Sequence, residues 1–144
     1  MTMSIQEISD RMEITILLTD YATAIDSKDF DALDDVFTQD ALIDYTAFGG
    51  IKGTLQEAKA FLKETLPLFA ATQHMIANIS IKLNGDTAMG RTMCHNPMLA
   101  KNQDGTQNLT FIGLWYIDKF VRTQKGWRIA DRKEEASYSF NLKG

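Results

Sequence analysis

Two histidines, His74 and His95, are the residues of this 144-residue chain best suited to acid–base chemistry, and there are no others. An unperturbed imidazole has a pKa of about 6.5, so it can accept a proton near neutral pH. His74 lies near the start of TQHMIANISIKL (residues 72–83), whose composition and alternation predict a β-strand. Two interpretations are open: a buried structural histidine, or a general base that takes a proton from carbon next to a carbonyl.

The two histidines are predicted to lie on neighbouring strands of one hairpin. An Asn-Gly pair at 84–85, between two strand-like segments, is typical of a two-residue hairpin loop. Pairing Leu83 with Asp86 then places His74 directly opposite His95, with Cβ atoms about 5 Å apart.

This register conflicts with the apolar pattern of the first strand. The alternating set that begins at Met75 is more apolar than the set that begins at His74. If helices cover the more apolar face, His74 points away from them unless a β-bulge changes the phase of the strand. Both arrangements stay open on the sequence alone.

A histidine in a buried strand needs a partner for its ring N–H. The first helix is predicted to bury a stripe with spacings of three and four, formed by Ile8, Met12, Thr15, Thr19, Ala22 and Asp26. A second apolar line, formed by Ile14, Leu17, Leu18, Tyr21 and Ile25, is predicted to widen the buried arc. A carboxylate on such a stripe is costly unless it is paired, so Asp26 is the predicted partner of His74. Turns and helix starts explain the nearby acids Asp29, Asp31, Asp34, Asp35 and Asp40.

The framework that must position these residues has helices first and strands afterwards. Asp29 is the predicted N-cap of a short second helix, and Thr54 with Glu57 forms a capping-box pattern for a third. Strands are predicted at residues 41–48, 72–83, 87–100, 107–121 and 127–140. This order predicts an α+β fold with helices on one face of a curved, mostly antiparallel sheet, in one domain spanning residues 1–144.

The strand at 107–121 is apolar on both of its faces. Its two alternating sets are Leu109, Phe111 and Trp115, and Ile112, Leu114 and Tyr116. An antiparallel sheet ordinarily leaves one face to water. A second copy of the chain is therefore predicted to cover the outer face, in a homo-oligomer of two or three subunits.

Composition excludes several classes of function. The net charge of −4 disfavours nucleic acid as a partner. The charged N-terminal segment lacks the apolar stretch of a signal peptide, and no segment approaches the about 18 apolar residues of a membrane span. The single cysteine, Cys94, precludes an internal disulfide and points away from His95 on a strand, so no Cys-His nucleophile pair is expected. The missing signal peptide and membrane span, and the single cysteine, predict a cytoplasmic protein. No metal site is predicted, because the two histidines lack the spacing of metal ligands.

Four segments resemble the SnoaL-like branch of the nuclear transport factor 2-like superfamily, closest to the scytalone dehydratases. They are AIDSKDFDALDDVFTQDALIDY, Gly53 before the third predicted helix, TQHMI and GWRIADR. The resemblance implies three helices packed on a cone-shaped sheet around an apolar pocket. It also implies an Asp–His pair acting as base, which falls on Asp26 and His74.

The same resemblance implies further site residues. Tyr45 in LIDYTAF matches a tyrosine that polarises the substrate carbonyl, whereas the second such tyrosine falls on Ile25. The family's second histidine lies near His95, although an ungapped alignment puts Met98 there, and Tyr116 is the nearest match to the family's pocket asparagine. The predicted pocket lining comprises Ile25, Phe48, Phe69, Met98, Phe111, Trp115 and Tyr116.

These observations favour a cofactor-independent lyase acting on a small, largely apolar ketone or polyketide-like substrate. His74 with Asp26 would abstract the proton, Tyr45 would donate to the enolate oxygen, and His95 would protonate the departing hydroxide. A double-bond isomerase with the same base, or a non-catalytic ligand-binding or assembly subunit, are the alternatives. For His95, a place in the core or on the surface is the competing interpretation.

Overall fold

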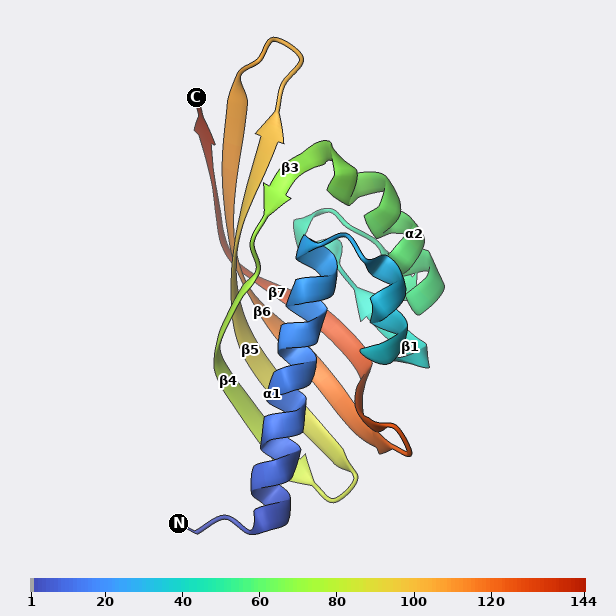
Figure 1. The fold of residues 1–144 in the computed structure, drawn as a ribbon. Helices are drawn as coiled ribbons and strands as arrows, with labels where there is room; N and C mark the ends of the chain where they lie inside the picture. Colours follow the sequence, from blue (N-terminus) through green and yellow to red (C-terminus); the bar gives the residue numbers. More distant parts are fainter. Residues whose placement is uncertain (1) are drawn as a thin grey trace.

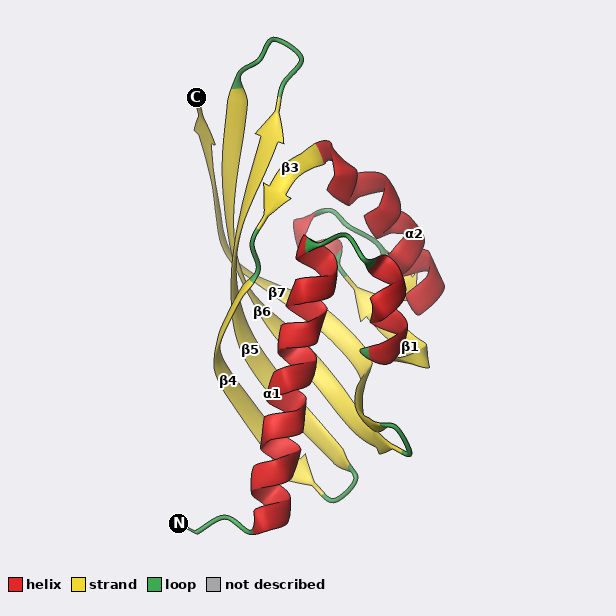
Figure 2. Ribbon diagram, viewed as in Figure 1, coloured by secondary structure: helices red, strands yellow, loops and turns green. Residues whose placement is uncertain are grey.

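A computed structural model describes residues 2–144. Helices pack on the concave side of a long, curved sheet, as predicted (Figures 1 and 2). The helices are α1 (Ile5–Asp26), η1 (Phe30–Asp35), η2 (Thr46–Phe48), α2 (Leu55–Thr65) and η3 (Leu66–Leu68). The strands are β1 (Phe37–Asp44), β2 (Lys52–Thr54), β3 (Phe69–Thr72), β4 (Met75–Asn84), β5 (Thr87–Lys101), β6 (Gln107–Thr123) and β7 (Gly126–Lys143). None of the helices in residues 2–144 is both long enough and apolar enough to cross a membrane.

The predicted helix starts are confirmed. Thr54 and Glu57 form the capping box of α2, and the Asp29 side chain accepts a hydrogen bond from the Ala32 backbone N–H. The second predicted helix differs in type, because η1 is a 3-10 helix rather than an α-helix. The molecule therefore has two α-helices and three short 3-10 helices within the described residues.

The predicted buried arc of α1 is confirmed along its second line, from Ile14 to Ile25, and wrong at the start of its first stripe. Ile8 and Met12 are 47% and 63% exposed. The side chains that α1 buries are instead Asp10, Ile14, Leu17, Leu18, Tyr21, Ala22, Ala24 and Ile25. The face toward the sheet thus follows the predicted second line and is rotated by about one residue from the first stripe, and Asp26 lies at its margin as the last residue of the helix.

The sheet has the order β2-β1-β7-β6-β5-β3, with β4 also paired to β5. All pairs are antiparallel except β1 with β7. The first predicted strand begins earlier and ends earlier than expected, and the second is broken in two. His74 lies in the short connection between β3 and β4 rather than within a strand.

A bulge in β4 decides which way His74 faces. Pairing shifts between Ala77 and Ser80, where Asn78 has a φ of 46°. The bulge brings His74 and Ile76 to the same face as Ile79 and the later apolar residues of the strand, which pack on the core. The conflict between the histidines and the apolar pattern is resolved in this way.

The predicted hairpin register is wrong by one loop position. Asn84 pairs with Thr87, so the two-residue loop is Gly85-Asp86. Gly85 has a φ of 59°, which glycine adopts without steric cost. Together with the bulge, this shift pairs His95 with Met75, and the two histidines are not directly opposite each other.

Candidate active site

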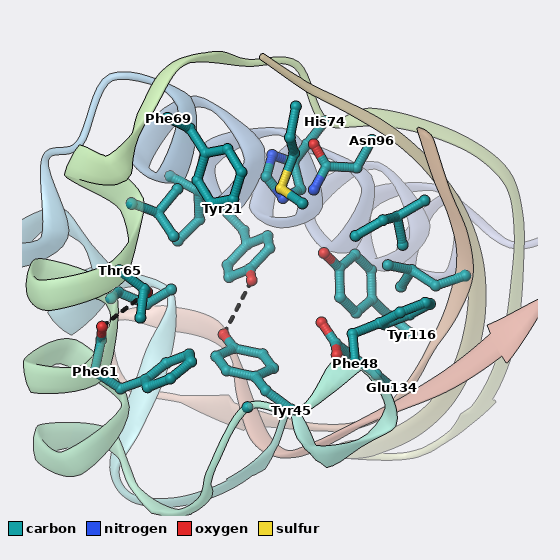
Figure 3. Close-up of a pocket in the computed structure, with 17 residues that line it drawn as sticks. Tyr21, Tyr45, Phe48, Phe61, Thr65, Phe69, His74, Asn96, Tyr116 and Glu134 are labelled. Carbon is teal, nitrogen blue, oxygen red and sulfur yellow. Dashed lines mark hydrogen bonds between the residues drawn. The ribbon is translucent and has the colours of Figure 1, made fainter. Parts of the chain in front are cut away.

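A pocket of about 200 Å³ opens between α1, α2 and the inner face of β5, β6 and β7 (Figure 3). This volume is below the about 300–1,000 Å³ of drug-sized ligand sites, so the pocket suits a small molecule. Its lining is mostly apolar and comprises Tyr21, Ile25, Tyr45, Phe48, Gly50, Phe61, Leu62, Thr65, Leu66, Phe69, His74, Asn96, Met98, Ile112, Leu114, Tyr116 and Glu134. In residues 2–144, no group of three or more His, Cys, Asp or Glu side chains is arranged to hold a metal ion.

Asp26 and His74 are in direct contact at the wall of this pocket. His74 Nδ1 lies 2.7 Å from Asp26 Oδ1, and the His74 backbone N–H donates to Asp26 Oδ2 at 2.8 Å. The His74 side chain is 7% exposed. With Nδ1–H donating to the carboxylate, Nε2 carries the free lone pair and is the nitrogen available to a pocket ligand.

Asp26 is held as a carboxylate by three donors. In addition to the two bonds from His74, the Thr72 hydroxyl donates to Oδ1 at 2.8 Å. Burial raises the pKa of Asp26, but the hydrogen bonds from His74 and Thr72 outweigh it and keep the pKa below its ordinary value. The carboxylate therefore stays charged near neutral pH and fixes the orientation of the imidazole.

Two tyrosines form a second polar feature on the pocket wall. The Tyr21 and Tyr45 hydroxyls are hydrogen-bonded to each other, with their oxygens 2.9 Å apart (dashed line between the two rings in Figure 3). Burial raises the pKa of Tyr21 and raises that of Tyr45 well above its ordinary value, so both are phenols near neutral pH. Because their mutual bond uses one of the two hydroxyl protons, the pair always has one O–H left to donate.

A buried ion pair packs against the rings of Tyr21 and Tyr116. Arg132 donates to both oxygens of Asp118 at 2.7 Å, and both side chains are fully buried. The guanidinium carbon lies 4.1 Å from the Tyr21 ring centroid and 4.0 Å from that of Tyr116. Stacking between a cation and two aromatic faces fixes where both hydroxyls point.

The structure places five of the seven predicted lining residues in the pocket: Ile25, Phe48, Phe69, Met98 and Tyr116. The other two, Phe111 and Trp115, lie on the outer face of the sheet. Pairing of β5 with β6 is regular throughout, so side chains alternate strictly, and Tyr116 faces inward while its neighbour Trp115 faces outward.

His95 is also on the outer face, and its predicted approach to the pocket is wrong. Its neighbour Asn96 faces inward, so His95 must face outward. There His95 Nδ1 lies 2.6 Å from the Tyr138 hydroxyl, and its ring stacks on Phe111 with centroids 5.9 Å apart. The Tyr138 ring occupies the space that a Cβ on Gly113 would fill, which is why this position is glycine.

Four polar lining residues were not among the predicted site residues: Tyr21, Thr65, Asn96 and Glu134. Tyr21 is one helical turn before Ile25, and Asn96 is two residues before Met98, so the two periodicities would have revealed both. Asn96 is 5% exposed and its Oδ1 has no hydrogen-bond partner.

Glu134 could not have been found in the same way. The pairing of β6 with β7 shifts between two neighbouring residues of β6: Lys119 pairs with Asp131, whereas Phe120 pairs with Ile129. This shift changes the inward-facing set from Trp127 and Ile129 to Arg132 and Glu134. Burial raises the pKa of the Glu134 carboxyl to about 7, while Arg132 lowers it and Asp44 raises it.

The fold and the sequence are shared with proteins of one family. The family described as "SnoaL-like domain" matches residues 6–133. An uncharacterised protein of Mycobacterium tuberculosis, Rv2910c, is 50% identical over 132 residues, which are 92% of this chain and 88% of that protein.

Two solved structures are similar in fold. A Novosphingobium aromaticivorans protein provisionally named a scytalone dehydratase aligns with a TM-score of 0.84 at 18% identity, covering 96% of this chain and 91% of the other. A hexachlorocyclohexane dehydrochlorinase, LinA type 2, aligns with a TM-score of 0.80 at 19% identity, covering 96% and 92%. Such identities establish a common fold and no more. Since the family match spans nearly the whole chain, the protein belongs to the SnoaL-like domain family of the nuclear transport factor 2-like superfamily.

Proposed function

We propose that this protein is a cofactor-independent lyase. It removes a proton from carbon next to the carbonyl of a small, largely apolar ketone and eliminates a group from the adjacent carbon. The observation that carries the proposal is the 2.7 Å contact between His74 Nδ1 and Asp26 at the wall of an apolar pocket, which leaves Nε2 free to act as base.

Each part of the pocket has a role in this reaction. Asp26 fixes the tautomer of His74 and stabilises the imidazolium that forms when Nε2 takes the proton. The free O–H of the Tyr21–Tyr45 pair donates to the carbonyl oxygen, where negative charge develops. The apolar lining excludes water, which strengthens both interactions.

A double-bond isomerase would use the same proton abstraction and differ only in where the proton returns. Mass spectrometry of the product separates the two, because elimination lowers the mass and isomerisation leaves it unchanged. A ligand-binding or assembly subunit would not exchange substrate protons at all.

Exchange of carbon-bound hydrogen for deuterium tests the base directly. The protein is incubated with 1-tetralone and with cyclohexanone in deuterated buffer, and deuterium at the carbon next to the carbonyl is measured by mass spectrometry. Exchange well above the buffer rate is expected for the wild type and for the outer-face control His95→Gln, but not for His74→Gln. Buffer-level exchange by the wild type with these probes, and with 3-hydroxycyclohexanone, would contradict the proposal.

The tyrosine pair predicts a non-additive result. Tyr45→Phe or Tyr21→Phe alone leaves one hydroxyl to donate, so each should lower kcat by about tenfold. The double variant removes both hydroxyls of the pair and should lose about 10²–10³-fold, the usual cost of removing an oxyanion donor. Exchange or elimination rates of the three variants check this, and equal losses in single and double variants would show that the pair does not donate.

The outer face supports a second proposal, that a second copy of this chain covers it. Exposed side chains on this face include Met75, Met89, Tyr138, Phe140 and Leu142, and Phe140 lies directly beside Phe111 across strands β6 and β7. Several large apolar side chains exposed on one face of a sheet are typical of a surface that another protein subunit covers. Light scattering is expected to give a dimer or trimer for the wild type and a smaller species for Phe140→Asp, whereas a monomeric wild type would refute the proposal.

A further inference from the structure

Glu134 is the one acidic side chain in the pocket lining, and the reaction steps above do not use it. Figure 3 shows its carboxyl beside the Tyr116 ring, on the side of the pocket away from His74. Register places it there too, because Glu134 on β7 pairs with Tyr116 on β6. A base and an acid thus face the same small cavity from different walls.

The neighbouring cation does not neutralise this carboxyl. Arg132, two residues earlier on the same strand, directs its guanidinium to Asp118 through two hydrogen bonds of 2.7 Å. The titratable groups of other elements that interact electrostatically with Glu134 are Tyr21 on α1, Asp44 at the end of β1, Tyr45, Cys94 on β5 and Tyr116 on β6. Four of these five groups are uncharged near neutral pH, and the fifth, Asp44, is an anion.

Such surroundings favour the protonated carboxyl. Burial raises the pKa of Glu134 to about 7, against a smaller opposing effect of Arg132. A substantial fraction of the protein therefore carries a proton on this residue at neutral pH, and an acid with a pKa close to the working pH is well matched to proton donation.

We propose that Glu134 is the general acid of the pocket and protonates the oxygen of a departing hydroxyl group while His74 takes the proton from carbon. The inference rests on the proposed lyase function and names its substrate class: β-hydroxy ketones. Hydroxide is a poor leaving group and needs an acid, whereas halide or carboxylate leaving groups do not.

His74 Nε2 takes the proton of the carbon next to the carbonyl, and the C–H electron pair becomes the new carbon–carbon double bond. The C–O bond of the β-carbon breaks, its electron pair stays on oxygen, and that oxygen takes the Glu134 proton and leaves as water. The imidazolium and the Glu134 carboxylate then return to their starting states by proton exchange with solvent, and the net change is loss of one water.

A pair of probes that differ only in the leaving group tests the assignment. 3-Hydroxycyclohexanone loses water and 3-acetoxycyclohexanone loses acetate, and both give the same ultraviolet-absorbing enone. Glu134→Gln keeps the shape of the side chain and removes the acid. It should lower the loss of water by about 10²-fold or more and change the loss of acetate by less than about threefold.

Controls separate this inference from the function on which it rests. Deuterium exchange next to the carbonyl should survive Glu134→Gln and vanish in His74→Gln, while Glu135→Gln, on the outer face beside Arg91, should behave as wild type throughout. If the wild type exchanges the proton but never releases water, or if Glu134→Gln releases water at the wild-type rate, the role of Glu134 is refuted and the base stands. Equal loss of both leaving groups in Glu134→Gln would show a structural role and also refute it. Absence of exchange in the wild type would refute both.

The pH profile provides an independent readout. Because the acid form of Glu134 is required, the rate of water loss in the wild type should fall as pH rises through about 7. The residual rate of Glu134→Gln should lack this decline, and so should the wild-type rate of acetate loss. A decline of the same size for both leaving groups would show that the pH dependence comes from another residue and would overturn the inference.

Discussion

Replacing His74 with glutamine is expected to lower kcat/KM for elimination by about 10²–10⁴-fold, the usual contribution of a positioned general base. This corresponds to about 3–5 kcal/mol of transition-state stabilisation. Glutamine is close to histidine in volume, and its amide can still donate to Asp26, so the fold should be unaffected. The loss should appear in kcat rather than KM, because the imidazole acts on the reacting proton and contributes little to ground-state binding.

Asp26→Asn should produce a smaller loss of the same kind, about 10²-fold. Asparagine has one acceptor oxygen in place of two, so it cannot accept at once from the Thr72 hydroxyl, the His74 backbone N–H and the His74 ring. The imidazole then loses its fixed tautomer, and the imidazolium loses its counter-charge. Steady-state kinetics with the elimination probes measure both variants, with His95→Gln as the matched histidine control. Activity within threefold of wild type in His74→Gln would remove the base from the mechanism.

Asp118→Asn is expected to destabilise the protein by about 3–5 kcal/mol, the largest effect on stability that we predict. The variant leaves the Arg132 guanidinium fully buried without a counter-charge, and an uncompensated buried charge is costly. Arg132 Nη1 already lacks a hydrogen-bond partner, so the site has no spare acceptor to compensate. Urea unfolding monitored by tryptophan fluorescence would measure the change.

A matched surface variant and a rescue make this prediction specific. Glu135→Gln removes the exposed pairing with Arg91, which should cost less than about 1 kcal/mol. The double variant Asp118→Leu/Arg132→Met should recover most of the stability, because apolar side chains of similar volume can replace a buried ion pair. It should still lose activity, since Arg132 no longer holds the Tyr21 and Tyr116 rings between which it is stacked. If Asp118→Asn lowers the free energy of unfolding by less than about 1 kcal/mol, the buried ion pair does not stabilise the protein as predicted.

Much of the fold follows from local sequence signals. Thr54 with Glu57, and Asp29, mark helix starts because their side chains satisfy backbone N–H groups within three residues. Alternation over residues 87–121 predicts β5 and β6 because a long regular ladder keeps its phase. The α+β class and the chain order of its elements could therefore be predicted.

The site was predictable only in part. The pairing of Asp26 with His74 was predicted from the buried stripe of α1. The same stripe also predicted that Ile8 and Met12 are buried, but both are exposed. Helix periodicity defines an arc but not the rotation of that arc toward the sheet, which depends on how the whole helix packs.

By itself the sequence determined the helix caps, the strand alternation, the α+β order and the residue types able to act as acid or base. Only the tertiary structure decided which of those residues share a cavity. Two bulges decide it: one in β4 turns His74 toward the helices, and the shift between β6 and β7 turns Glu134 inward. A bulge reverses the faces of all residues that follow it while leaving the alternating pattern intact, and its position is set by pairing with strands distant in the sequence.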